Sequence, residues 1–268
     1  MPNITDLKQK HRATWASGDY DRVAQGILPV ADHVVRSGRI RAGESVLDVA
    51  CGTGNTTLMA RARGATVTGL DLTPELLAIA QKRAAAEGYD DILWKEGDAE
   101  NLPFPDGAFD VVVSSCGLMF APDQKKVASE VARVTKRGGR IAIQAWTREG
   151  GIGRMFAVTG AHVPPPAGAP SPFMWGDEEK VRALFGTSFR DYQFERYDCP
   201  EYADTPEQVA DLFIDCYGPT QRAYQSLAPE KAAAFRKDLI DLYRKYVTPA
   251  DGKVRWGREY VITLATRA

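Results

Sequence analysis

The stretch that decides the fold is residues 46–55, which read VLDVACGTGN. A short run of strand formers ends there in a Gly-x-Gly turn, at Gly52 and Gly54, which lets the backbone pass close to a ligand where a Cβ atom would collide. Residues 56–63 then have the character of a helix that ends at Gly64. Unpaired N–H groups at a helix start can face a polar ligand. The order of strand, turn and helix predicts a ligand site, or else a turn in which glycine only reverses the chain.

A second expected strand ends in a carboxylate. Residues 65–71 read ATVTGLD, and Thr73 and Pro74 then give a helix start, with Thr as the N-cap and Pro at the first helical position. The carboxyl ends of neighbouring strands in a doubly wound sheet border one crevice, where an acidic residue roughly 20 positions after the glycine turn grips ribose hydroxyls. Asp71 is therefore predicted to contact a ribose.

The glycine pattern separates two nucleotide-binding families. A dinucleotide fold uses Gly-x-Gly-x-x-Gly, and its third position is Thr57 here, which disfavours a nicotinamide-dependent oxidoreductase. Instead, the chain has Asp48-x-Ala50-x-Gly52-x-Gly54. This pattern resembles the first motif of the class I S-adenosylmethionine-dependent methyltransferases, commonly Asp/Glu-x-Gly-x-Gly-x-Gly. Ala50 departs from it by one methyl group at the first glycine.

Later segments resemble the same family in the same order. Residues 92–99 resemble its third strand, with Asp98 at the place of the acidic residue that meets the adenine amino group; residues 109–115 resemble its fourth strand, and residues 130–143 its helix, glycine turn and fifth strand. The resemblance covers residues 45–146 and is closest to the methyltransferases of ubiquinone and menaquinone biosynthesis. It implies an α/β, Rossmann-like, seven-stranded and mainly parallel sheet flanked by helices, with the last strand antiparallel.

The resemblance also implies an activity and a set of site residues. The activity is S-adenosylmethionine-dependent methyl transfer to an O, N or C nucleophile of a small organic acceptor, leaving S-adenosylhomocysteine; a non-catalytic S-adenosylmethionine-binding protein is the other alternative. The residues assigned to the cofactor are Trp15, Tyr20, Asp48, Ala50, Gly52, Gly54, Asn55, Asp71, Leu72, Asp98, Ala99, Ser115 and Cys116.

Several of these residues also have a purely structural interpretation. Asp48 could cap the turn that follows it, and Trp15 and Tyr20 could be ordinary packing aromatics of an N-terminal helix instead of a flap over the cofactor. Cys116 is expected to be a wall residue, since no His lies near it in sequence to activate it. His162, one of three histidines, is the leading candidate for a catalytic base, although a His in a proline-rich loop is more often solvated and this chemistry does not require a base.

The amino-acid composition limits the classes of ligand and partner that we expect for this protein. The chain has 34 basic and 35 acidic residues, so no basic excess points to nucleic acid. Its four cysteines form no Cys-x-x-Cys pair, which argues against a metal site or a disulfide framework. No apolar run reaches the roughly 18 residues of a membrane-spanning helix, and residues 1–6 lack the features of a signal peptide. We expect a cytoplasmic protein, monomeric or homodimeric, with a small-molecule acceptor.

The expected domain plan has three parts. Residues 1–203 form the Rossmann-like core with an N-terminal helical flap, in which residues 11–37 have a helical pattern broken by a turn at residues 15–20. Residues 204–254 form a helical lid inserted between the last two strands, with apolar stripes after Thr205 and Pro229, and residues 255–268 contain the last core strand. The lid and the apolar segment 173–175 are predicted to shape an acceptor pocket; a packing subdomain without ligand contact is the alternative.

Overall fold

The computed structural model describes residues 4–166 and 169–268, so residues 1–3 and the middle of the proline-rich segment lie outside the description. The chain forms two compact units. Unit 1 consists of Met1–Ile27, Trp146–Ala169 and Tyr197–Tyr260, and unit 2 consists of Leu28–Ala145, Pro170–Arg196 and Val261–Ala268. Each unit is described by itself.

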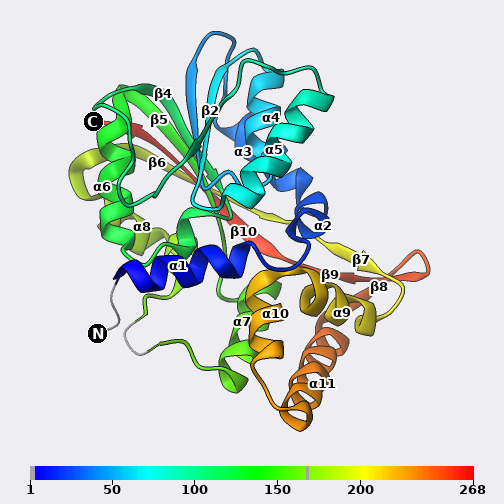
Figure 1. The fold of residues 1–268 in the computed structure, drawn as a ribbon. Helices are drawn as coiled ribbons and strands as arrows, with labels where there is room; N and C mark the ends of the chain where they lie inside the picture. The colour runs from blue at the N-terminus through cyan, green and yellow to red at the C-terminus, as the bar shows by residue number, and fades with distance from the viewer. Residues whose placement is uncertain (1–3, 167–168) are drawn as a thin grey trace. The chain divides into compact units, whose positions relative to one another are not determined.

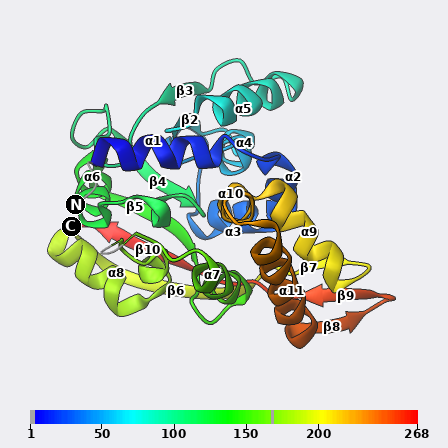
Figure 2. The same ribbon diagram turned by 60° about the horizontal axis from the view of Figure 1, so that its bottom comes forward.

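Unit 2 is built on a seven-stranded sheet in the order β3-β2-β1-β4-β5-β10-β6. Its strands are β1 (Ser45–Val49), β2 (Thr66–Asp71), β3 (Leu93–Glu96), β4 (Phe109–Ser115), β5 (Thr135–Trp146), β6 (Phe189–Asp198) and β10 (Glu259–Arg267). The pairs β1–β2, β1–β4, β2–β3 and β4–β5 are parallel, and the arrow of β10 runs opposite to that of β5 in Figure 2. The mainly parallel sheet is confirmed. Strand order reverses at β1, which makes its carboxyl end the switch point where such sheets bind ligands.

Helices cover both faces of this sheet. They are α3 (Leu28–Ser37), α4 (Asn55–Ala62), α5 (Pro74–Ala86), α6 (Gln124–Val134) and α8 (Glu178–Phe185), with short 3-10 turns η1 (Leu118–Phe120), η2 (Pro172–Gly176) and η3 (Gly186–Ser188). Helices α3, α4 and α5 lie on one side, and α6 and α8 lie on the other (Figure 1). Central strands β1 and β4 are mainly apolar and almost fully buried, as is typical of strands covered on both faces.

Unit 1 combines helices with a small antiparallel sheet. The helices are α1 (Ile4–Trp15), α2 (Tyr20–Gln25), α7 (Gly151–His162), α9 (Pro206–Cys216), α10 (Gly218–Gln225) and α11 (Pro229–Tyr246); the strands β7 (Glu201–Ala203), β8 (Val247–Ala250) and β9 (Lys253–Trp256) pair in the order β7-β9-β8. A turn at Asp251 and Gly252, both with positive φ, joins β8 to β9 as hairpin turns of this kind require. The helices predicted from Thr205 and Pro229 are present.

Three sequence-based expectations need correction. Residues 11–37 fall into α1, α2 and α3: the chain turns at Gly18, within the expected turn of residues 15–20, and a second, unexpected break lies around Gly26. Strand β5 starts directly at Thr135 and includes the glycine pair, with Gly138 at φ 75° beside a register shift. The segment 204–254 also holds strand β8, and β9 extends to Trp256, beyond the expected end of the lid; the last core strand, expected within residues 255–268, is β10.

Candidate functional site

The glycine turn at the end of β1 has an unusual backbone. Ala50, Gly52 and Gly54 have φ angles of 56°, 55° and 88°, all in the left-handed region. The Cys51 N–H donates to the Leu70 carbonyl at 3.0 Å, which continues the β1–β2 ladder into the turn. A Cβ atom on Gly54 would lie 3.1 Å from both Ala80 and the Trp94 ring, so Gly54 is also required for packing. Such strained turns persist where the surrounding structure fixes them, typically at functional sites.

Asp71 holds this turn from the tip of β2. Its carboxylate accepts the Gly52 N–H at 2.8 Å and the Thr73 N–H at 2.8 Å, and the residue is 7% exposed. Thr73 occupies the N-cap position of α5, as predicted, but its side chain makes no capping hydrogen bond. An ionised carboxylate has about four lone-pair sites, so Asp71 can accept ribose hydroxyls in addition to these two bonds.

Asp48 lies on β1, two residues before Ala50, the first left-handed residue of the turn. Its Oδ2 accepts the Thr57 hydroxyl at 2.6 Å, whereas its Oδ1 is buried without a hydrogen-bond partner. Burial raises the pKa of Asp48 to about 7, with a further increase from the charge of Asp71, against the Thr57 hydrogen bond. Asp48 thus bonds to Thr57, in the first turn of α4, and the alternative that it caps the turn through backbone N–H groups stays a prediction. An unpaired buried carboxylate oxygen suits a ligand with N–H groups or positive charge.

The raised pKa of Asp48 makes a prediction about stability against pH. The folded protein keeps a proton on Asp48 up to about pH 7, whereas the unfolded chain loses it near its ordinary pKa of about 4. The unfolding free energy contributed by this group is therefore largest below about pH 4 and falls, by up to on the order of 4 kcal/mol, as pH rises through this window.

We expect Asp48→Asn to flatten this slope, because asparagine does not titrate. Denaturant unfolding of the ligand-free protein at pH 5 and pH 8 measures it, with Asp90→Asn at an exposed position as the control. A wild-type slope that survives in Asp48→Asn contradicts the burial-driven ionisation cost; Asp71, whose pKa burial also raises, is then the source.

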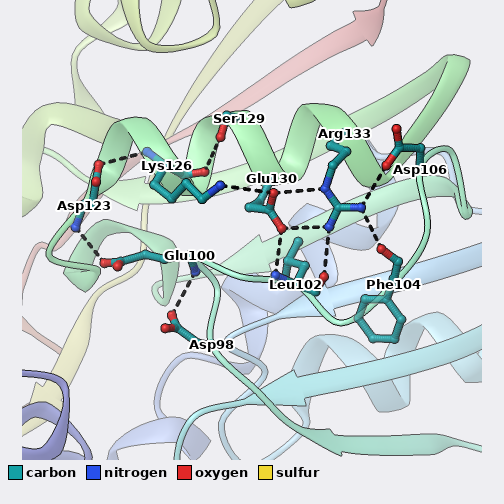
Figure 3. Close-up of polar contacts among 10 residues, drawn as sticks. All are labelled: Asp98, Glu100, Leu102, Phe104, Asp106, Asp123, Lys126, Ser129, Glu130 and Arg133. Atoms are coloured by element: carbon teal, nitrogen blue, oxygen red, sulfur yellow. Dashed lines mark hydrogen bonds and ion pairs between the residues drawn. The ribbon is translucent and has the colours of Figure 1, made fainter. Parts of the chain in front are cut away.

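Asp98 begins a loop that is tied to α6 (Figure 3). The Asp98 Oδ1 accepts the Glu100 N–H at 2.9 Å, and the Glu100 Oε1 accepts the Asp123 N–H at 2.7 Å. Asp123 is itself the N-cap of α6 and accepts the Lys126 N–H. A chain of carboxylates and backbone amides thus connects the half-buried Asp98 to the start of a helix.

Arg133 holds the rest of this loop. Its guanidinium donates to the carbonyls of Leu102 at 2.9 Å and Phe104 at 2.7 Å, and pairs with Glu130 at 2.7 Å and Asp106 at 3.0 Å (Figure 3). Glu130, 7% exposed at the side chain, also accepts the Leu102 N–H at 2.8 Å. The Arg133 guanidinium lowers the pKa of Glu130, so the pair stays ionised. Nothing in the local sequence pattern predicted this clamp.

The tip of β4 approaches the same switch point. Cys116 has φ 60°, and its N–H donates to the Oε1 of Gln144 at 2.8 Å, while its Sγ lies 2.9 Å from the same oxygen. Because Oε1 must face the Cys116 N–H, the buried Nε2 of Gln144 is left without a partner. The buried thiol lies beside the side-chain amide of Gln144 here. The expected wall role of Cys116 and Ser115 stays a prediction.

The remaining predicted residues fall into two groups. Asn55 begins α4, and Leu72 and Ala99 follow the tips of β2 and β3 as half-buried residues. Trp15, Tyr20 and His162 belong to unit 1. The Trp15 ring packs edge-on against Tyr20 at 5.5 Å and against Tyr217 at 5.7 Å.

His162 is not a loop residue, as expected from the prolines, but ends α7. Its Nε2 lies 2.8 Å from the Asp238 carboxylate of α11, and its ring lies 5.1 Å from that of Phe235. This pairing gives the imidazole a structural partner in unit 1. The cofactor roles of Trp15 and Tyr20 and the catalytic role of His162 stay predictions.

Comparisons with known proteins agree with this geometry. A family model described as a methyltransferase domain matches residues 47–143, which contain the glycine turn, Asp71 and Asp98. An uncharacterized protein of Mycobacterium tuberculosis is 41% identical over 96% of this chain and 94% of its own length. A demethylmenaquinone methyltransferase of Thermus thermophilus is 44% identical over 38% of this chain and 47% of its own length.

A solved structure shares the fold. It is a phosphoethanolamine N-methyltransferase of Haemonchus contortus in complex with phosphomonomethylethanolamine and S-adenosylhomocysteine, with a TM-score of 0.54, 18% identity, and 87% of this chain and 50% of that chain covered. No cluster of metal-ligating side chains occurs among the described residues. In the same part of the chain, no helix has the length and apolar character needed to cross a membrane.

Proposed function

This chain belongs to the class I S-adenosylmethionine-dependent methyltransferases, and we propose that the acceptor it methylates is a small organic molecule. The observation that supports a cofactor at the switch point most directly is the unpartnered Asp48 Oδ1 beside a turn with three left-handed residues. Both features fit a ligand that carries amino groups and approaches the backbone closely. The even charge balance, with 34 basic and 35 acidic residues, supports a small acceptor over a nucleic acid.

The residues of the site would bind and align the reactants. When bound, S-adenosylmethionine supplies a methyl group already activated by a sulfonium, so transfer is one in-line displacement that leaves S-adenosylhomocysteine. We propose that Asp71 holds the ribose, that Asp98 and Ala99 border the adenine, and that Ser115 and Cys116 border the methionine part. Alignment of two bound reactants can contribute on the order of 7–11 kcal/mol, so no side chain has to act as a base.

Further proposals concern the cellular compartment, the oligomeric state and the helices that select the acceptor. We propose a cytoplasmic protein, because four free cysteines fit a reducing compartment. A monomer or a homodimer is a separate proposal. We propose that the helices of residues 204–254 select the acceptor. Their apolar faces, at Phe213 and Cys216 of α9 and at Leu239 and Tyr243 of α11, are buried in unit 1, which fits equally the alternative of a packing subdomain.

Isothermal binding of S-adenosylmethionine and methyl transfer to a panel of phenols, amines and quinols test the function. We expect micromolar binding and transfer to at least one acceptor class. Binding without transfer to any acceptor would support the cofactor-binding protein instead, and binding of a nicotinamide cofactor alone would support the oxidoreductase.

Alanine variants in the same assays test the site. Asp71→Ala is expected to weaken S-adenosylmethionine binding by roughly 1.5–3 kcal/mol, because hydrogen bonds to a charged group are lost. Trp15→Ala and Tyr20→Ala test the predicted flap through the same isotherms, and His162→Ala tests the predicted base through kcat alone. Unchanged affinity in a folded Asp71→Ala protein removes the ribose assignment; unchanged kcat in His162→Ala removes the base.

A further inference from the structure

Arg83, in the last turn of α5, contacts the glycine turn of the switch point. Its Nη1 donates to the Thr53 carbonyl at 2.8 Å and to the Asn55 Oδ1 at 2.7 Å, and it lies 3.2 Å from the Thr53 hydroxyl. Thr53 is 2% exposed, whereas Arg83 is half-buried. One guanidinium nitrogen therefore reaches a main-chain and a side-chain oxygen on both sides of Gly54.

The contact falls on the half of the turn that β2 does not hold. Leu70 and Asp71 fix the first half, through the N–H groups of Cys51 and Gly52. The second half, from Thr53 to Asn55, turns at Gly54 with φ 88° and leads into α4. A left-handed backbone needs such constraints, since otherwise it relaxes toward commoner conformations.

The charge of Arg83 faces the dipoles of two helices. Arg83 stands in the last turn of α5, where the helix dipole favours a cation, and it reaches Asn55, the first residue of α4, where the dipole repels one. Because these two effects oppose each other, the contact is carried by the hydrogen bonds to Thr53 and Asn55. Loss of cofactor affinity at an unchanged Tm, on replacement of Arg83 by an uncharged residue, therefore separates a positioning role from a purely structural one.

We propose that Arg83 is a positioning residue for the cofactor, which acts by fixing Thr53 and Asn55. It keeps the N–H groups of the turn and the start of α4 in the direction that the cofactor needs. The inference rests on the proposed function only through binding of S-adenosylmethionine, and Arg83 itself has no part in methyl transfer.

The test compares Arg83→Met with Lys82→Met, the exposed neighbour on the same helix. In Arg83→Met we expect the Kd and the KM for S-adenosylmethionine to rise about tenfold, which corresponds to loss of one or two charge-assisted hydrogen bonds. The kcat at saturating cofactor should stay within about twofold, and the Tm should match that of Lys82→Met. Arg83→Lys, which keeps a donor, should recover part of the affinity.

A double-mutant cycle with Asn55→Ala examines the route of the effect. If Arg83 acts through Asn55, the two losses of affinity are not additive, and hydrogen exchange of the amides at 52–55 accelerates in Arg83→Met. Equal affinity of Arg83→Met and Lys82→Met overturns the proposal, as do additive losses in the cycle. If Arg83→Met does not fold, Arg83→Lys and Arg83→Gln replace it, because both keep a hydrogen-bond donor. The proposal then requires that both variants keep the wild-type Tm and bind S-adenosylmethionine more weakly than wild type, each to a different degree. Otherwise the role of Arg83 is structural. A wild-type protein that does not bind S-adenosylmethionine contradicts the proposed function itself, before any variant is compared.

Discussion

Replacing Arg258 by methionine is expected to lower the unfolding free energy by about 3–5 kcal/mol, the usual cost of breaking a buried ion pair by removing one partner. Arg258 is 1% exposed and pairs with Glu201 at 3.0 Å. Its guanidinium also donates to the carbonyls of Cys199 at 2.7 Å and Gly26 at 2.9 Å. It thereby joins three separate passages of the chain within unit 1.

The loss is large because Cys199 is buried and the Glu201 side chain is only 17% exposed. Burial raises the pKa of Glu201 and the charge of Arg258 opposes that rise, so the variant leaves a carboxylate without its compensating charge. The matched control is Arg255→Met. Arg255 pairs with Asp198, but both side chains are 35% exposed, and such a pair contributes about 0–1 kcal/mol. Denaturant unfolding of both variants measures the two losses of unfolding free energy. Equal losses would show that the Arg258–Glu201 pair stabilises the protein no more than an exposed ion pair does.

The fold was predictable where the chain has strong local patterns. Residues 46–55 and 65–71 combine apolar strand formers, glycine turns and helix starts, and the structure has β1, α4, β2 and α5 there. The small sheet of unit 1 was missed because β7, β8 and β9 are only three or four residues long and alternate weakly. Short strands like these are specified by their pairing partners and not by their own sequence.

The site was predictable as a set of strand tips but not as a network. Spacing placed Asp48 and Asp71 near one turn, and the structure brings both to it. Arg83 was not found because its partners lie 28 and 30 positions earlier and its helix pattern is ordinary. For the hydrogen bond between Asp48 and Thr57, the sequence did hold a signal, because both residues belong to the motif that has Thr57 where a dinucleotide fold has glycine. Side-chain partners across such distances depend on packing, which a single sequence does not show.

The tips of β1 and β4 meet so closely that one added methyl group should disturb the cofactor site. A Cβ atom on Gly117 would lie 2.4 Å from the Ala50 Cβ and 2.7 Å from the Ala50 carbonyl oxygen. Both contacts are far inside van der Waals distance, and Ala50 cannot swing away easily because it already has φ 56°. Gly117→Ala must therefore push the end of β4 away from the glycine turn.

We expect Gly117→Ala to cost about 1–3 kcal/mol of unfolding free energy, as overpacking does, and to weaken S-adenosylmethionine binding at least tenfold. Gly160→Ala is the control, because its Cβ atom would lie 3.9 Å from Pro165, an ordinary contact distance, and alanine is favourable within a helix. Adding Ala50→Gly to Gly117→Ala removes the 2.4 Å contact but not the one to the carbonyl, so it should restore part of both losses. Binding isotherms and unfolding curves on the three proteins decide the matter. Full affinity in Gly117→Ala would mean that the two strand tips can separate without moving the cofactor site, and the close approach would then serve packing alone.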